Sequence, residues 1–401
     1  MLQSTIVRLK RLNWLEMKSK IHKWLLCNMG LFPLHLRTIL RIQSHATNET
    51  KPLRLILVFL SIFSCLILSF KPLQLSEYQA TAPKMNLSEY GFFKGNIAEQ
   101  KPINGIIPYA LNTPLFSDYA EKLRFVKIPE GKAVAYHATE VLDFPVGTTI
   151  IKTFYYPNDF RDVSKGRRLM ETRLLIHEEN GWKALEYVWN DEQTDAVLEV
   201  AGDTKEVSYV YLDGKKRTQQ YSMPNLNQCK GCHNRSEVMT PIGPSARQLN
   251  GDFAYEQGTE NQLVHLQKAG LLKDMPDLKD CPKLAVWNKP ETGTLEERSR
   301  AWLDINCAHC HNPKGPAMTS GLNLSIHESN PTAMGFNKTP VAAGRGSGNR
   351  DYDIVRGNPD KSILVYRMES TDSGIMMPEV GRKTTHQEGV ALVREWIKSL
   401  K

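Results

Sequence analysis

Two short segments of the chain place cysteine and histidine in the same spacing. They read CKGCH at 229–233 and CAHCH at 307–311. In a Cys-x-x-Cys-His segment, two thiols three positions apart can add to the two vinyl groups of a haem, and the adjacent imidazole then lies under the iron as an axial ligand. We therefore predict two covalently attached c-type haems. The expected haem-binding residues are Cys229, Cys232 and His233 in the first motif and Cys307, Cys310 and His311 in the second.

Other uses of paired cysteines predict other patterns. Zinc ribbons pair two Cys-x-x-Cys segments roughly 15–20 residues apart, whereas 74 residues separate Cys232 from Cys307. A thioredoxin-like redox pair needs a βαβ context, which the sequence lacks. A disulfide gives no reason for a histidine to follow both pairs. Zinc, disulfide and redox pairs remain alternatives, but haem accounts for all six residues.

The remaining axial position of each iron decides between electron transfer and chemistry on small molecules. For the second haem we predict Met377 as the distal ligand, with Met376 as its rival. Met377 begins a Met-Pro dipeptide 66 residues after His311. Helical patterns at 295–306 and 388–400 flank this region, and the order helix, motif, Met-Pro loop, helix is typical of a small single-haem unit.

The distal position of the first haem has several candidates. Met239 and Met275, which follow the first motif in the chain, are the two methionine candidates, and His265 ranks behind them. A lone histidine on a helix is more often packed or exposed than a ligand. An open sixth position is the remaining alternative.

The elements that must position these residues fall into two regions. Residues 86–225 are rich in strand signals, including apolar runs joined by Glu-Asn-Gly within 170–189 and by Asp-Gly within 206–223. After residue 225, Gly, Pro and Asn punctuate short helical stretches. We predict an α+β multidomain chain with a mostly antiparallel β domain at 86–225, a first c-type haem unit at 226–294 and a second cytochrome c domain at 295–401.

The N-terminal region has the pattern of a targeting signal. Residues 55–70 carry no charge and form a helix of about 24 Å at 1.5 Å per residue, close to the thickness of a bilayer core. The basic segment 1–54 precedes it, so the rest of the chain should lie outside the cytoplasm. We predict a signal anchor, with a cleaved signal peptide and lipid attachment at Cys65 as alternatives. Met17 or Met29 is an alternative start.

The charge of the chain excludes one class of partner. Residues 1–54 hold ten Lys and Arg against two acids, whereas residues 55–401 hold 41 of each sign. The globular part therefore has no basic excess, and we predict no binding to nucleic acid. Partners are expected to be redox proteins, and a membrane through the N-terminal helix.

From about residue 86 to its end, the chain resembles a family of exported diheme c-type cytochromes with an N-terminal β domain and a largely unknown role. The resemblance rests on TPLFSDYAEKLRFVKIPEG (113–131), DFPVGTTIIKTF (143–154), ETRLLI (171–176), NQCKGCHNRSEVMTPIGPSARQLN (227–250), AWLDINCAHCHNPKGPAMTSGL (301–322), IMMPEVGR (375–382) and EGVALVREWI (388–397). It implies a two-haem electron carrier in the periplasm or anchored on the periplasmic side of the inner membrane. Some relatives occur with quinone-dependent sugar-dehydrogenase-like proteins, so the resemblance also implies a dehydrogenase as electron donor and a cytochrome or oxidase as acceptor. The long basic segment at residues 1–50 departs from the family pattern.

Three functions compete at this stage. The first is electron transfer from a periplasmic dehydrogenase towards the respiratory chain. The second is a diheme peroxidase-like enzyme with an open or displaceable sixth site on the first haem. In the third, aromatic residues of the β domain form a carbohydrate- or partner-binding face, although strand aromatics are more often core. The aromatic residues in question are Tyr155, Tyr156, Trp182, Tyr187 and Trp189.

Overall fold

The computed structural model describes residues 82–401, which belong to one compact unit. The predicted basic segment 1–54 and the apolar segment 55–70 lie outside the described residues. Among residues 82–401, no helix has both the length and the apolar character needed to cross a membrane.

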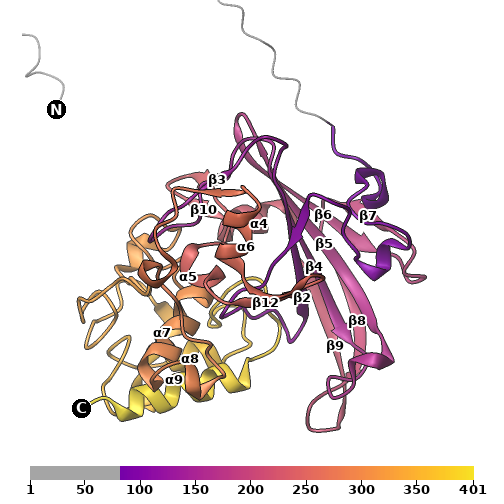
Figure 1. Cartoon of the computed structure of the whole chain (residues 1–401). Coiled ribbons are helices and arrows are strands. Elements are labelled where there is room, and N and C mark those ends of the chain that lie inside the picture. The colour runs from indigo at the N-terminus through magenta and orange to yellow at the C-terminus, as the bar shows by residue number, and fades with distance from the viewer. Residues whose placement is uncertain (1–81) are drawn as a thin grey trace, which may run out of the picture. The chain divides into compact units, whose positions relative to one another are not determined.

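A six-stranded antiparallel sheet with the order β1-β2-β4-β5-β6-β7 is the largest element (Figure 1). Its strands are β1 (Ile106–Pro108), β2 (Glu121–Lys127), β4 (Thr149–Pro157), β5 (Arg167–Glu178), β6 (Gly181–Trp189) and β7 (Ala196–Glu199). The hairpin predicted from Glu-Asn-Gly is the β5–β6 connection. The expected mostly antiparallel β domain is therefore confirmed.

The two faces of this sheet carry different side chains, because successive residues of a strand point to opposite faces. One face buries the large apolar residues Phe125, Ile151, Leu174 and Leu185 against Leu87 and Phe92 of the segment that precedes β1. The opposite face carries charged residues in the middle of the sheet and lies toward the helices. Tyr187 and Trp189 belong to the first core, and Tyr156 is equally buried, so these three aromatics do not form a binding face.

Smaller strand pairs surround the main sheet. A long hairpin of β8 (Asp203–Val210) and β9 (Lys216–Met223) turns at the predicted Asp-Gly. The other pairs are β10 (Asn234–Arg235) with β11 (Val238–Met239), β12 (Asp252–Tyr255) with β13 (Gly258–Asn261), and the parallel pair β3 (Val134–Ala135) with β14 (Leu272–Lys273).

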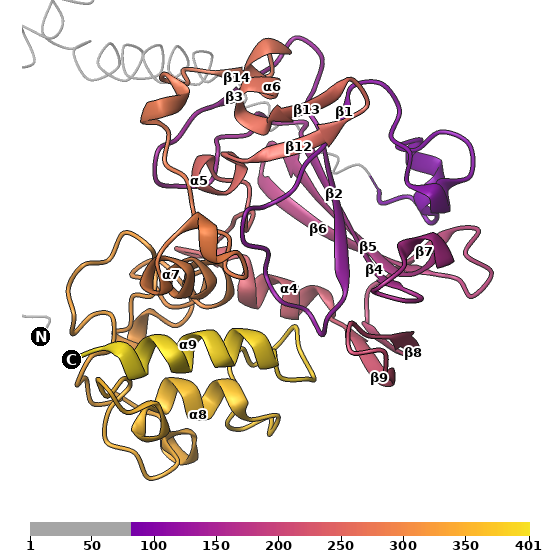
Figure 2. The same cartoon turned by 60° about the horizontal axis from the view of Figure 1, so that its bottom comes forward.

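The helices follow the strands in the chain and pack beside the sheet (Figure 2). They are α4 (Leu226–Cys232), α5 (Ala246–Leu249), α6 (Gln262–Lys268), α7 (Leu295–Asn306), α8 (Ile363–Glu369) and α9 (Gln387–Ser399). The helix predicted at 295–306 has the observed bounds of α7. Helix α6 begins only at Gln262, because residues 258–261 pair with β12 as β13.

Short 3-10 helices occur in the connections. They are η4 (Leu87–Tyr90), η5 (Ile97–Glu99), η6 (Val163–Lys165), η7 (Leu278–Asp280), η8 (Pro290–Thr292), η9 (Met318–Ser320), η10 (Gly344–Ser347) and η11 (Pro359–Lys361).

Helices α7 and α9 cross in close contact and form the centre of the helical core. A capping box between Thr294 and Glu297 starts α7. At the crossing, a Cβ atom added to Gly389 would lie 2.6 Å from ring atoms of Trp302 and 2.5 Å from Nδ1 of His386. The absence of a side chain at residue 389 therefore sets how closely the two helices approach.

The variant Gly389→Ala tests this contact. Helix propensity alone favours alanine over glycine by about 1 kcal/mol in a helix interior. The clash with Trp302 reverses that sign, and overpacking of a core costs about 1–3 kcal/mol. We expect a net loss in the free energy of unfolding of about 1 kcal/mol or more, measured by urea denaturation. The exposed Ala391→Ser should change stability by less than about 0.5 kcal/mol, and a stabilised Gly389→Ala would contradict the close crossing.

Candidate functional site

The first Cys-x-x-Cys-His motif lies at the end of helix α4. Asn225 and Gln228 start this helix with a capping box. Residues three positions apart share one face of a helix, so Cys229 and Cys232 present their thiols on the same side. His233 is the C-cap of the helix, and its backbone N–H donates to the carbonyl of Cys229.

The second motif follows directly on helix α7. Cys307 is the C-cap residue of that helix. A turn brings the backbone N–H of Cys310 and that of His311 to the carbonyl of Cys307, at 3.1 and 2.9 Å. Both motifs therefore attach to the end of a helix, although α4 is short and α7 is long.

A single hydrogen bond fixes the tautomer of the His233 ring. Its Nδ1 atom lies 2.9 Å from the carbonyl oxygen of Thr240. A carbonyl oxygen can only accept, so Nδ1 carries the proton and donates it. The Nε2 atom of the neutral ring then carries no proton and has a free lone pair. It has no hydrogen-bond partner within residues 82–401.

The His311 ring is fixed in the same way by a side chain. Its Nδ1 atom lies 3.0 Å from the hydroxyl oxygen of Ser320. That hydroxyl donates its own proton to the carbonyl of Ala317 at 2.7 Å, so it accepts the hydrogen bond from Nδ1 of His311. Nε2 of His311 is therefore also a lone pair, and it too has no partner in the described part of the chain.

Burial keeps both rings neutral. It lowers the pKa of His233 and that of His311 to about 4, and nearby cationic groups act in the same direction. A neutral imidazole whose other nitrogen donates to a fixed acceptor is the form in which histidine binds a metal. The sequence predicted these two ligands, but it did not indicate their acceptors Thr240 and Ser320.

The main cavity of the described residues opens beside the first motif, between the charged face of the sheet and the helices. It contains about 1540 Å³ of space not filled by protein atoms, part of it open to solvent. Cys229, Cys232 and His233 line one side of it, and Met377 of the Met-Pro segment lines another. A second cavity of about 1190 Å³ shares Cys232 and His233 with the first.

The two motifs meet in space. The Sγ atoms of Cys232 and Cys310 and a ring nitrogen of His309 lie within 4.8 Å of one another. The contacts of Cys232 with Cys310 and with His309 lower the pKa of the Cys232 thiol, whereas the contact with Cys232, together with burial, raises the pKa of Cys310. Burial also raises the pKa of Cys229 to about 11 and that of Cys307 to about 12.

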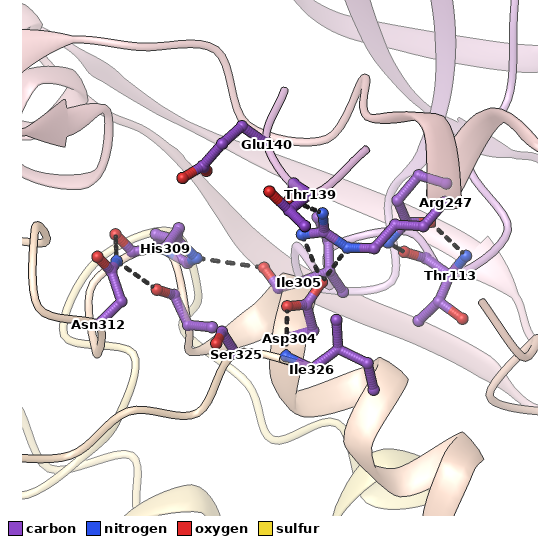
Figure 3. Close-up of polar contacts among 12 residues, drawn as sticks. Thr113, Thr139, Glu140, Arg247, Asp304, Ile305, His309, Asn312, Ser325 and Ile326 are labelled. Carbon is purple, nitrogen blue, oxygen red and sulfur yellow. Dashed lines mark hydrogen bonds and ion pairs between the residues drawn. The ribbon is translucent and has the colours of Figure 1, made fainter. Parts of the chain in front are cut away.

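An ion pair holds helix α7 in place next to this meeting point (Figure 3). The guanidinium of Arg247 donates from Nε and Nη2 to one carboxylate oxygen of buried Asp304, at 3.2 and 3.1 Å. Arg247 also donates to the carbonyl of Thr139, and the other oxygen of Asp304 accepts from the backbone N–H of Ile326 at 3.0 Å. These hydrogen bonds connect α7 to α5, to the loop at Thr139 and to the loop at Ile326.

His309 lies between the two cavities rather than on its own motif's ligand side. Its Nδ1 donates to the carbonyl of Ile305 at 3.2 Å (Figure 3), which leaves Nε2 for the thiol cluster. Sequence analysis gave this histidine no ligand role, and the cluster with Cys232 and Cys310 was not predicted.

The structure separates the methionines proposed as distal ligands. Met377 lines the main cavity together with His233, and its carbonyl accepts from Arg382 at 2.9 Å. The charge of Arg382 lowers the pKa of Cys307 against the larger effect of burial. Met376 is buried beside it but does not line the cavity.

The two methionines proposed for the first haem lie elsewhere. Met275 packs against the core cluster that contains Leu249 and Leu272. Met239 is paired with Asn234 in the short β10–β11 hairpin. Neither is among the described residues that line the main cavity. His265 stacks on Tyr255 at a ring separation of 3.7 Å.

Comparisons of the chain with family models, curated proteins and solved structures found no match.

The buried neutral histidines predict a pH dependence of stability when no group is bound at the rings. The pKa of about 4 in the folded chain lies below the value of about 6.5 for an exposed histidine. Between these values the unfolded chain binds more protons, so stability is fully present above pH 6.5 and is lost as pH falls towards 4. Urea denaturation across this window should show the slope.

Substitution of one histidine shows how much of this pH dependence of stability comes from that residue. His311→Gln should reduce it, because the variant has no ring to protonate in either state. The exposed His327→Gln is the matched control and should leave it unchanged. A His311→Gln variant with the full slope would disprove burial of a neutral ring at that position.

Proposed function

We propose that this chain is an exported diheme c-type cytochrome that transfers electrons from a periplasmic dehydrogenase towards the respiratory chain. The observation that carries the proposal is the state of the two motif histidines. Each is neutral, is fixed by donation from Nδ1, and presents an unpartnered Nε2 next to two thiols on a helix end.

The donor set fits two c-type haems. In each motif the two cysteines would hold the porphyrin edge, and the histidine would hold the iron through Nε2. A bound haem supplies reversible one-electron chemistry, and its axial ligands tune the potential. The residues of the chain have three tasks: Thr240 and Ser320 orient the rings, the helix ends space the thiols, and the sheet and helices limit access of water to the main cavity.

The adjacent motifs support transfer between two cofactors. Cys232 and Cys310 are the last thiols of their motifs, and their sulfur atoms lie within 4.8 Å of each other. Groups attached at these two atoms would therefore have neighbouring edges. Such an arrangement suits a chain in which one haem receives an electron and passes it to the other.

A metal ion or a disulfide at the thiol cluster explains fewer residues. The cluster supplies three ligand atoms, from Cys232, His309 and Cys310, whereas a structural zinc site has four protein ligands. Either group would also leave the bare Nε2 atoms of His233 and His311 without a role. The proposal of two haems uses both histidines and all four thiols.

The axial ligands follow from the same geometry. We assign Met377 to one haem, because it lines the main cavity. The sequence predicted Met377 for the second haem, whereas the described residues that line this cavity with it include His233 of the first motif and not His311. The two small cytochrome c-like units, 226–294 and 295–401, belong to this proposal. So do the resemblance to the diheme family, the membrane address in residues 55–70, and the location in the periplasm or on the periplasmic side of the inner membrane.

The haem count of the purified protein tests the proposal. The chain should be expressed with a haem-attachment system in an export-competent host and examined by intact mass and redox spectra. We expect two haems per chain and low-spin spectra in the reduced state. Cys307→Ala together with Cys310→Ala should leave one haem, and Cys281→Ala, outside both motifs, should leave two. Colourless protein with the mass of the bare polypeptide, or with zinc, would refute it.

A diheme peroxidase-like enzyme is the second candidate, and one observation favours it. Within residues 82–401, neither Met239 nor Met275 is among the residues that line the main cavity with His233, so no methionine of the unit 226–294 faces that cavity. An exchangeable sixth position on that haem would permit reaction with hydrogen peroxide.

Peroxide assays separate the two candidates. For the electron carrier we expect no rapid turnover of hydrogen peroxide by the half-reduced protein and no high-spin signal from either haem. Met377→Ala should abolish any methionine–iron charge-transfer band from one haem, whereas Met318→Ala, an exposed methionine, should not. Rapid peroxide turnover by the unaltered protein would instead establish the enzyme.

A further inference from the structure

A row of charged side chains crosses the face of the sheet that borders the main cavity. The strand registers pair Arg124 with Lys152, Lys152 with Arg173, and Arg173 with Glu186. Directly paired residues lie on the same face, so the four side chains form one line across β2, β4, β5 and β6. We call Arg124, Lys152 and Arg173 the cation row, and all three line the main cavity.

Two members of the cation row, Arg124 and Lys152, form no ion pair within residues 82–401. Arg124 is 7% exposed, and its Nη2 atom has no hydrogen-bond partner. The ammonium of Lys152 makes no ion pair or hydrogen bond with any residue of the described chain and lies 4.7 Å from the ring centroid of Phe154. Burial and repulsion from its cationic neighbours hold the pKa of Lys152 well below its usual range. Such an arrangement is costly without an anion to complete it.

The acids near the cation row pair with Arg173 and not with Arg124 or Lys152. Glu171 is fully buried and forms a two-pronged pair with Arg173, at 2.7 and 2.6 Å, and it also accepts from the hydroxyl of Tyr221. Glu186 at the end of the row lies 3.9 Å from Nε of Arg173, and within residues 82–401 neither of its carboxylate oxygens has a hydrogen-bond partner. Burial beside Glu171 raises the pKa of Glu186. Both acids therefore face Arg173, and neither forms an ion pair with Arg124 or Lys152.

The position of the first motif indicates what the missing anion is. Helix α4, which carries Cys229 and Cys232, packs against β6 at the Glu186 end of the row. Strands are about 4.8 Å apart, so Arg124 lies about 14 Å across the sheet from that end. In a haem, the two propionates are on the edge opposite the two groups that cysteines modify. Arg124 thus lies across the sheet from the attachment points, whereas Lys152 lies in the middle of the row, about 10 Å from that end.

We propose that Arg124 and Lys152 bind the propionate carboxylates of the haem attached at the first motif. This inference rests on the proposed function and deepens it, because it gives the β domain a role as one wall of the haem site. The shared chemistry is that of a carboxylate or similar anion in a buried cationic pocket. The two sources of such an anion are the haem itself and a soluble ligand, and the experiment distinguishes them.

The reduction potential of the first haem tests the cation row. Oxidised iron carries one more positive charge than reduced iron, so a nearby cation favours the reduced state. Lys152→Met and Arg124→Met, in the full chain with its haems, should each lower the ratio of reduced to oxidised first haem at a fixed applied potential about tenfold, which is 59 mV for a one-electron couple. Resonance Raman bands of the propionates should shift in the same variants.

A matched control removes a cation from the same strand. Lys127 lies at the end of β2, is exposed, and alternates to the opposite face from Arg124. Lys127→Met should leave both haem potentials unchanged. Intact mass and circular dichroism establish that each variant carries two haems and is folded, and Lys152→Gln serves where Lys152→Met does not fold.

The outcomes separate the inference from the proposed function. Variants that hold two haems with unshifted potentials, or that shift no more than Lys127→Met, would overturn the cation row alone. Protein that attaches no haem would overturn the proposed function and the inference together. Inorganic phosphate, titrated at constant ionic strength, should not change the potentials of the unaltered protein. A phosphate response that Lys152→Met abolishes would show a soluble anion as the occupant and would also overturn the proposal.

Discussion

Everything proposed for the two motifs depends on one type of hydrogen bond, the donation from histidine Nδ1 to a fixed oxygen. The carbonyl of Thr240 and the hydroxyl of Ser320 accept from His233 and His311, and each bond fixes the ring orientation, the tautomer and the availability of Nε2 at once. Such partners also raise the basicity of a ligating histidine. Without them, each ring would be free to rotate or to reverse its protonated nitrogen.

The rest of the described chain can be understood as support for these two rings. Helix α7 holds the second motif, and its contacts with α9 across Gly389 and with Arg247 through Asp304 fix it from two sides. The sheet provides a stiff wall whose far face is packed with apolar side chains. Its near face carries buried charge that a purely structural sheet would exclude, because unpaired buried cations destabilise the folded state.

Local patterns predicted the elements well, whereas long-range contacts could not be predicted from them. The bounds of α7, the hairpin turns and the antiparallel sheet follow from spacing, caps and turn residues. The meeting of Cys232 with Cys310 joins positions 78 residues apart, and no local rule predicts it. A lysine inside the apolar strand TIIKTF was a readable signal for Lys152, but its alignment with Arg124 and Arg173 depends on strand register.

The closeness of Cys232 and Cys310 has a consequence for how such a chain matures. Free thiols this near each other are prone to cross-link in an oxidising compartment, and a Cys232–Cys310 disulfide would consume one attachment point of each motif. Assembly of two cofactors in that setting therefore requires that the thiols be kept reduced until the first haem is attached. Once Cys232 forms a thioether, it can no longer cross-link with Cys310, so filling the first motif removes one oxidation partner of the second.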